Sequence, residues 1–250
     1  MQNDEWSFLQ NYTSARIARG RAGHSLPTNE LLKFQADHAR ARDAVYSELD
    51  TDLLKNTLET QLLLETILLE SKVQNRQEFL QRPDRGRFLN EDSGSFLKNR
   101  EAGKSDICFV IADGLSAKAV NTHALPVLEK LIPHLQKLTW KIAPVCLVKQ
   151  GRVAIGDEIA FLLKAEIVVI FIGERPGLSS PDSMGAYLTF KPQAGLTDES
   201  RNCISNIRPE GLNYDFAMQK LLYLLTEMKS RKLSGVNLKD GMEEGQYIED

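Results

Sequence analysis

The fold is decided by D-I-C-F-V-I-A at residues 106–112 and by E-I-V-V-I-F-I at residues 166–172. A short run rich in β-branched and aromatic residues, ended by turn residues such as Asp113 and Gly114, is typical of a strand that is buried on both faces. A third run, I-A-P-V-C-L-V at residues 142–148, has the same character. Strands of this kind occur in parallel sheets covered by helices on both sides. The sequence therefore predicts an α/β fold.

Helical patterns separate these apolar runs. Helices are expected at about residues 116–138, 156–163 and 213–232, and A-Y-L-T-F-K at residues 186–191 alternates like a strand near an edge. Pro126 and Pro133 predict a kink or a break in the first of these helices. Strands that alternate with helices indicate parallel pairing with crossover connections. We therefore expect an open, mostly parallel Rossmann/flavodoxin-like sheet with flanking helices over residues 106–235.

The N-terminal part of the chain has a different pattern. Side chains that would share one helix face recur at intervals of three and four residues: Leu31, Phe34, His38, Ala41, Val45 and Leu49. A second helix is expected after Thr51, and it would carry Leu54, Leu58, Leu62, Leu63, Ile67 and Leu68. No strand-like alternation stands out in this part. Residues 1–81 are therefore predicted to form a small helical N-terminal domain.

Two further segments have the composition of surface structure. Residues 82–105 mix Gly, Ser and Asn with charges of both signs, which is typical of a linker or arm. Its arginines, Arg82, Arg85 and Arg87, would either grip a partner carboxylate or phosphate or simply be solvated. Residues 236–250 carry five acids against one lysine, so we expect an acidic, disordered tail.

The overall composition excludes several classes of protein. The chain has 250 residues, a net charge of −3 and 42% hydrophobic residues, which gives no general attraction to nucleic acid or to an anionic membrane. Its apolar runs are too short to cross a bilayer, and its first residues lack the features of a signal peptide. Three widely spaced cysteines favour a reducing compartment over a disulfide framework. We therefore expect a cytoplasmic protein that binds neither nucleic acid nor membrane.

Four turn segments are expected to meet at one edge of the sheet. They are residues 113–116, 151–153, 173–178 and 203–206. In open parallel sheets, ligands bind beyond the carboxyl ends of the strands, where the strand order reverses. The alternatives are that these segments are tight turns without a ligand, and that Glu174 and Arg175 pair with each other at the surface. Cys108 and Cys146 fall within predicted strands, which leaves Cys203 as the thiol best placed to touch a ligand.

Several standard sites can be discounted. Gly103-Lys104-Ser105 is similar to the end of a phosphate-binding P-loop, but residue 98 is Lys where the first glycine belongs. No G-x-G-x-x-G follows a predicted strand, and the four histidines lack the spacing of metal ligands. No complete acid–base or nucleophile set is present. A sheet that is built to hold a ligand but lacks catalytic residues indicates a cofactor-binding subunit, with no metal site of its own.

Short motifs along residues 16–238 then point to a known family. They are G-R-A-G (20–23), L-L-K-F-Q-A-D-H-A-R-A-R-D (31–43), R-P-D-R-G-R (82–87), I-A-D-G-L-S (111–116), G-R-V (151–153), G-E-R-P-G-L (173–178), R-N-C-I-S-N-I (201–207) and S-G-V-N-L (234–238). In this order they resemble the small (light) subunit of ethanolamine ammonia-lyase. Several collinear motifs are far more specific than any one of them.

The resemblance implies a carbon–nitrogen lyase, active as a hetero-oligomer with a large, barrel-forming subunit, that encloses adenosylcobalamin at the interface of the two subunits. In such enzymes, cobalt–carbon homolysis gives an adenosyl radical that abstracts hydrogen from ethanolamine, and rearrangement yields acetaldehyde and ammonia. The resemblance also implies that Val153, Glu174 and Cys203 contact the cofactor. The catalytic residues are expected on the large subunit, and none is assigned to this chain.

Two further expectations concern the cofactor and the location. The D-x-H-x-x-G motif, with which some cobalamin proteins supply a histidine to cobalt, is missing, because His38 follows Asp37 directly and His123 has no Asp two residues before it. We therefore expect the cofactor to keep its own benzimidazole on cobalt, in the base-on form. Many family members carry an N-terminal extension ahead of the helical domain, which is sometimes used for packaging in a bacterial microcompartment, whereas this chain starts almost at the helical domain. The cytoplasm is therefore expected first and a microcompartment second.

Two other classes of function compete with the resemblance. One is a non-catalytic adaptor whose α/β domain only binds a partner protein. The other is a stand-alone nucleotide-binding α/β protein, and the lack of a phosphate-cradling glycine loop argues against it.

Overall fold

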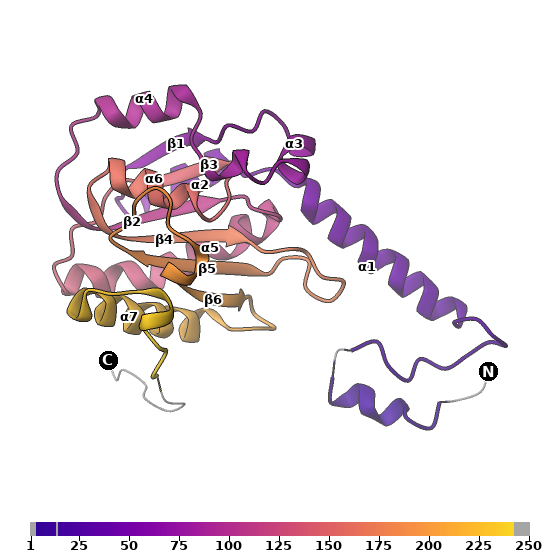
Figure 1. Ribbon diagram of the computed structural model, residues 1–250. Coiled ribbons are helices and arrows are strands. Elements are labelled where there is room, and N and C mark those ends of the chain that lie inside the picture. The colour runs from indigo at the N-terminus through magenta and orange to yellow at the C-terminus, as the bar shows by residue number, and fades with distance from the viewer. Residues whose placement is uncertain (1–3, 14, 243–250) are drawn as a thin grey trace.

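A six-stranded sheet forms the centre of the protein in the computed structural model, which describes residues 4–13 and 15–242 (Figure 1). The strands are β1 (Thr66–Glu70), β2 (Ser105–Ala112), β3 (Val145–Lys149), β4 (Ala165–Gly173), β5 (Met184–Phe190) and β6 (Arg201–Ile207), in the order β1-β3-β2-β4-β5-β6. The pairs among β1 to β4 are parallel, whereas β5 runs antiparallel to β4 and β6 antiparallel to β5. The prediction of an α/β fold with an open, mostly parallel sheet is confirmed.

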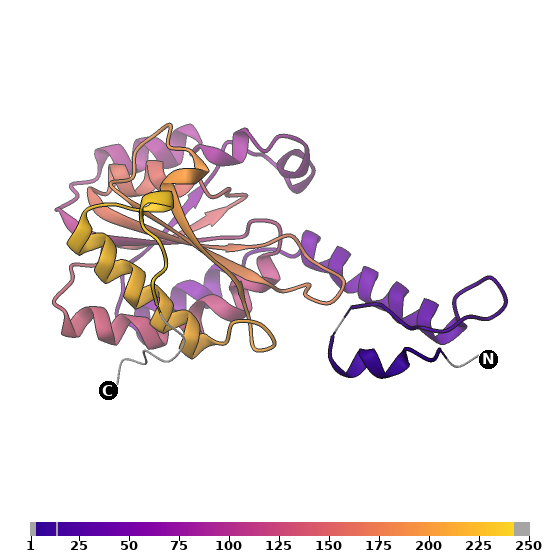
Figure 2. The same ribbon diagram turned by 60° about the horizontal axis from the view of Figure 1, so that its bottom comes forward.

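Helices cover both faces of this sheet (Figure 2). The α-helices are α1 (Thr28–Tyr46), α2 (Thr51–Thr60), α3 (Arg76–Gln81), α4 (Glu91–Asn99), α5 (Ala117–Lys137), α6 (Ile155–Leu162) and α7 (Tyr214–Arg231). Short 3-10 helices are η1 (Ser7–Asn11), η2 (Arg85–Arg87), η3 (Asp198–Ser200) and η4 (Gly235–Asn237). Residues of α2, α5 and α7 pack on one face, and residues of α4 and α6 pack on the other. None of the helices in the described ranges combines the length and the apolar character that a membrane span needs.

Strand β2 shows why the apolar runs specify a central sheet. Ile107, Phe109 and Ile111 point into the core beneath α5 and α7, while the alternating Cys108 and Val110 point into the core beneath α6. All five are fully buried. Because full burial of a large apolar side chain contributes roughly 1.5–3 kcal/mol, a strand with such residues at every position is stable only between two helical layers.

The connections create a reversal of strand order beside β2. Helix α5 joins β2 to β3 on one face, and α6 joins β3 to β4 on the opposite face, so that β3 and β4 lie on either side of β2. The carboxyl ends of β2 and β4 therefore flank a topological switch point, where open α/β sheets bind their ligands. Helix α5 is continuous although Pro126 and Pro133 lie inside it, so no break occurs there.

The prediction that residues 1–81 are purely helical is wrong at β1. Helix α2 ends at Thr60, and residues 66–70 pair with β3 as an edge strand of the sheet. Ile67 and Leu69 are buried, whereas Leu68 between them is 50% exposed. This alternation with a period of two is short, and it is hidden in the sequence by the leucines that precede it. The partner strand that selects the extended conformation lies almost 80 residues away.

Parts of the expected arm and tail also pack on the body. Residues 91–99 form α4, which Asn90 caps by accepting a hydrogen bond from the Ser93 backbone, and Leu97 of α4 is fully buried. At the other end, Leu238 is buried in the core beneath α7, and residues 243–250 lie outside the described residues. The division of the chain into domains at residues 81, 105 and 235 stays a prediction.

Helix α1 extends away from the sheet (Figures 1 and 2). Ala44, near its C-terminal end, is its one buried residue, and Leu31, Leu32 and Phe34 are exposed. Of the stripe predicted for this helix, Leu31 and Phe34 are exposed, and Leu49 lies beyond the end of the helix at Tyr46. The body meets the end of α1 near the carboxyl ends of the strands, where the Arg76 Nε donates to the Val45 carbonyl over 2.6 Å.

Candidate functional site

A cavity of about 360 Å³ lies at the carboxyl ends of β2, β3 and β4. It is lined by residues 114–115 after β2, 152–153 after β3, 172–175 at the end of β4, and Tyr187 of β5. Three of the four turn segments predicted to meet at this edge therefore contribute to one cavity. It lies at the switch point, where the strand order predicts ligand binding.

Asp113 ties the first two of these segments together. It is 3% exposed, and its carboxylate accepts hydrogen bonds from the backbone N–H groups of Gln150 at 2.9 Å and Gly151 at 3.1 Å. Burial raises the pKa of Asp113 to about 6, against the opposing effect of these hydrogen bonds and of Arg76, whose guanidinium lies 4.0 Å away. Asp113 thus sets the position of the turn that carries Arg152 and Val153.

Gly114 and Gly173 bring the loops after β2 and β4 into direct contact. The Leu115 N–H donates to the Gly173 carbonyl at 2.9 Å, and a Cβ atom on Gly173 would collide with the Ser116 carbonyl. Gly114 has a φ of +55°, which glycine adopts without strain. In the structure the close approach at Gly114 is made by the end of β4.

Glu174 is held in place by donors from two segments. The hydroxyls of Ser183 and Ser205 both donate to its carboxylate, and the Asn206 backbone N–H donates at 3.2 Å. Its own backbone N–H donates to the Ser183 carbonyl at 2.9 Å. Glu174 therefore joins the β4–β5 loop to the end of β6, and its side-chain partners are these groups instead of Arg175.

Cys203 lies in the middle of β6, so the prediction of a turn segment at residues 203–206 is wrong. It faces Tyr187 on β5, and the Tyr187 hydroxyl and the Cys203 thiol are hydrogen-bonding partners. The residue as a whole is exposed, but the thiol packs against Tyr187, and this local burial raises the pKa of the Cys203 thiol. The thiol is therefore protonated at neutral pH and is a weak nucleophile.

The three residues predicted to contact a cofactor are brought together around Tyr187. Val153, Glu174 and Tyr187 line the cavity. Cys203 does not line it, but its thiol contacts Tyr187. Cys203 and Ser205 are exposed, so the sheet is open to a ligand on this side. Tyr187 was not among the predicted site residues. Recognising residues 201–207 as a strand would have placed its side chain beside Cys203, because paired residues on neighbouring strands point to the same face.

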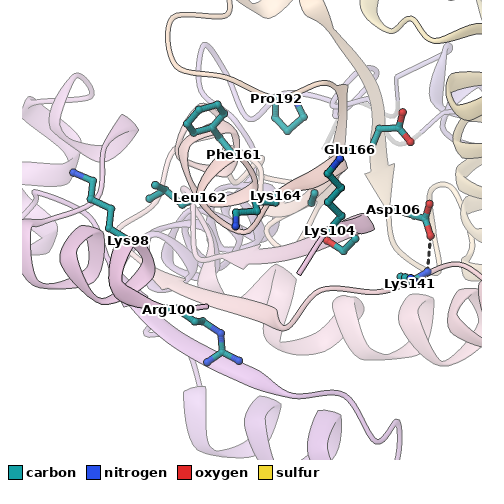
Figure 3. Close-up of a pocket in the computed structure, with 12 residues that line it drawn as sticks. Lys98, Arg100, Lys104, Asp106, Lys141, Phe161, Leu162, Lys164, Glu166 and Pro192 are labelled. Carbon is teal, nitrogen blue, oxygen red and sulfur yellow. Dashed lines mark hydrogen bonds between the residues drawn. The ribbon is translucent and has the colours of Figure 1, made fainter. Parts of the chain in front are cut away.

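A larger hollow of about 910 Å³ lies at the opposite edge, by the amino ends of β2 and β4 (Figure 3). Its basic side chains point in different directions, as Lys98 and Arg100 do in Figure 3. Arg100 pairs with Glu65 at 2.6 Å. Lys98 lies in the last turn of α4, where positive charge offsets the helix dipole. This hollow therefore offers no set of converging groups.

The groups at the switch-point cavity can bind a ligand through hydrogen bonds, charge and aromatic contact. The cavity provides a carboxylate acceptor in Glu174, a hydroxyl in Ser205, an aromatic ring in Tyr187 and guanidinium groups in Arg152 and Arg175. Within residues 4–13 and 15–242, no three side chains of the types His, Cys, Asp and Glu lie close enough to hold a metal ion.

Comparison with known proteins identifies close relatives. The family model of the ethanolamine ammonia-lyase light chain (EutC) matches residues 3–239. The ethanolamine ammonia-lyase small subunit of Azotobacter vinelandii is 53% identical over 241 residues, which cover 95% of this chain and 89% of the relative. The small subunits of Pseudomonas fluorescens, at 52% over 238 residues (94% and 86%), and Ralstonia nicotianae, at 52% over 241 residues (95% and 89%), are similar to the same extent. The similarity includes every segment that lines the switch-point cavity.

Proposed function

Because the chain belongs to the ethanolamine ammonia-lyase light-chain family, we propose that it is the small subunit of an adenosylcobalamin-dependent enzyme that converts ethanolamine into acetaldehyde and ammonia. It works in a hetero-oligomer with a large subunit, and the cofactor lies between the two. The observation that carries the proposal is the gathering of Val153, Glu174 and Cys203 around Tyr187 at the switch point.

The residues at the cavity fit one side of a cobalamin. The cofactor presents amide groups around its corrin ring, and the fixed carboxylate of Glu174 is a strong acceptor for an amide N–H. Val153 and the ring of Tyr187 add apolar contact area. Ligand pockets usually measure about 300–1,000 Å³, so a cavity of about 360 Å³ would take only part of so large a molecule. The rest must be enclosed by another chain.

This chain contributes binding and orientation. When bound, adenosylcobalamin supplies the adenosyl radical that starts the reaction. Glu174 orients the corrin rim, Val153 packs against it, and the protonated thiol of Cys203 adds a neutral surface that does not compete for cobalt. The sequence lacks the D-x-H-x-x-G motif, which supports a base-on cofactor. The catalytic residues belong to the large subunit, and residues 106–235 act as the cobalamin-binding domain.

The exposed apolar residues of α1 support a protein partner. Leu31, Leu32 and Phe34 are exposed together on a helix that leaves the body near the cavity edge (Figure 1). Gathered apolar side chains of this kind mark interaction surfaces in soluble proteins. We place the complex in the cytoplasm, with packaging in a bacterial microcompartment as the alternative.

Co-expression with the large subunit tests the proposal. The assembled complex, loaded with adenosylcobalamin, is expected to form acetaldehyde from ethanolamine, and either subunit alone is expected to be inactive. A complex that assembles and binds the cofactor without turnover would contradict the proposed activity. If substitutions of Val153, Glu174 and Cys203 left the cobalamin absorption spectrum and affinity of the complex unchanged, the adaptor hypothesis would be favoured instead.

A further inference from the structure

We propose that Arg152 and Arg175 form a subsite for a phosphodiester at the rim of the switch-point cavity. This inference rests on the proposed function, because the phosphodiester is the one that links the corrin to the nucleotide base of cobalamin. Neither residue belongs to the cofactor contacts that the family resemblance implies.

The two arginines come from neighbouring turns and line the same cavity. Arg152 follows β3 and Arg175 follows β4. Arg152 is anchored, since its Nη2 donates to the Phe79 carbonyl at 2.9 Å and its guanidinium lies 4.0 Å from the centre of the Phe79 ring. Arg175 is exposed, and its side chain makes no hydrogen bond or ion pair with the described part of the chain. One guanidinium is therefore held in place and the other is available.

Several positive charges gather at this rim. Burial lowers the pKa of the Arg152 guanidinium, and the charges of Arg76, Arg87 and Arg175 lower it further, against the opposing effect of the Asp113 carboxylate. The carboxylates of Asp113 and Glu174 already accept hydrogen bonds within the chain. Asp113 accepts from two backbone N–H groups, and Glu174 accepts from two hydroxyls and a backbone N–H. A group of arginines that repel one another is stabilised when an anion binds among them.

Arg152 also has donor capacity that the chain does not use. Its Nε is shielded from water and has no hydrogen-bond acceptor among the described residues. A buried donor without an acceptor costs about 1–3 kcal/mol, so the structure lacks a partner at this point. The planar fork of a guanidinium matches the oxygens of a phosphate and binds them in pairs. Both the charge and the free donors thus favour a phosphate oxygen over a neutral amide.

The buried carboxylate of Asp113 prepares the subsite. By holding the Gln150 and Gly151 N–H groups it orients the turn that continues into Arg152, whose own N–H donates to the Gly86 carbonyl at 2.8 Å. The backbone on both sides of Arg152 is therefore fixed before a ligand arrives. A subsite that is organised in advance loses less entropy on binding.

The test compares two forms of the cofactor on the assembled complex of both subunits. Adenosylcobalamin carries the phosphodiester, and adenosylcobinamide lacks both the phosphate and the base. We expect Arg152→Gln and Arg175→Gln each to raise the Kd for adenosylcobalamin roughly tenfold or more, as the loss of a charge-assisted hydrogen bond predicts. The Kd for adenosylcobinamide should change less than about twofold. Binding is followed by the change in the cobalamin absorption spectrum.

Two controls keep the outcome decisive. Arg231→Gln removes an arginine that pairs with Glu227 on the exposed side of α7 and should leave both Kd values unchanged. If adenosylcobinamide binds too weakly to measure, the salt dependence of adenosylcobalamin binding replaces it, and it should be steep for the wild-type complex and flatter for both variants. Because the Arg175 side chain is exposed, Arg175→Gln also separates binding from any change in folding caused at Arg152.

The possible failures are distinguishable. A wild-type complex that does not bind adenosylcobalamin would overturn the proposed function itself. A wild-type complex that binds it, with variants that bind as tightly, would overturn only the phosphodiester subsite. The subsite is also overturned if both variants weaken adenosylcobinamide as much as adenosylcobalamin, or if they leave the salt dependence unchanged.

Discussion

Replacing the buried carboxyl of Asp113 with an amide, in Asp113→Asn, should change how stability depends on pH. The pKa of Asp113 is raised from 3.8 to about 6 in the folded chain. Between these values the unfolded chain has already lost the proton that the folded chain still holds, so ionisation of Asp113 destabilises the fold as the pH rises. One pKa unit corresponds to about 1.4 kcal/mol, which makes this penalty about 2–3 kcal/mol between pH 4 and pH 7. The amide of the variant cannot ionise, so the variant escapes the penalty.

The measurement is the free energy of unfolding in urea for the wild-type chain and for Asp113→Asn, at pH 4 and at pH 7. The amide of the variant can accept only one of the hydrogen bonds from Gln150 and Gly151, so the variant should be less stable at pH 4 by about 1–3 kcal/mol. Relative to the wild type it should regain about 2–3 kcal/mol at pH 7. Taking the difference between two chains cancels the other titrating groups. A difference that stays constant with pH, or that widens towards pH 7, would refute the assignment of a buried, ionisable Asp113.

Three substitutions test other parts of the structure. Glu174→Gln removes the negative charge that accepts hydrogen bonds from the two serine hydroxyls and would accept one from an amide of the cofactor. The substitution should weaken adenosylcobalamin binding to the complex roughly tenfold in a spectroscopic titration. Unchanged affinity would contradict a cofactor contact. Arg201→Met breaks the ion pair between Arg201 and Asp157, whose two side chains are 2% and 4% exposed, respectively. The substitution should lower the free energy of unfolding in urea by about 3–5 kcal/mol. A loss below about 1 kcal/mol would argue against the pair. Leu97→Ala should cost about 2–5 kcal/mol, while its exposed neighbour Phe96→Ala should cost far less; equal effects in thermal unfolding would mean that α4 does not pack on the sheet.

The central strands could be predicted because strands buried on both faces consist of consecutive apolar residues. In β2 and β4 nearly every position is apolar, and only a strand between two helical layers uses such a run. The ligand edge followed from the same prediction, because the carboxyl ends of parallel strands meet on one side of a sheet. The turn segments after β2, β3 and β4 were therefore placed correctly before any contact was known.

The edge strands could not be predicted in the same way. In β6 only Arg201, Ile204 and Ile207 are buried, and the polar residues between them are as common in loops as in strands. Strand β1 has five residues and follows a leucine-rich helix, so its alternation is easily read as more helix. Strand β1 pairs with β3, which is distant in sequence, and β6 pairs with β5, which precedes it across a loop. Their conformation is decided by pairing, since local preference for the extended state is weak.

By itself, the sequence determined the layered α/β architecture, the edge of the sheet at which the turn segments gather and, through short collinear motifs, the family. These properties depend on residue types and spacing that are local to each segment. Only the tertiary structure decided that Tyr187 stands between Cys203 and the cavity, that Glu174 is held by Ser183 and Ser205, and that Arg152 and Arg175 line the same cavity. Hydrogen bonds, burial and charge balance depend on distances between segments far apart in the chain, and those distances exist only once the sheet has formed.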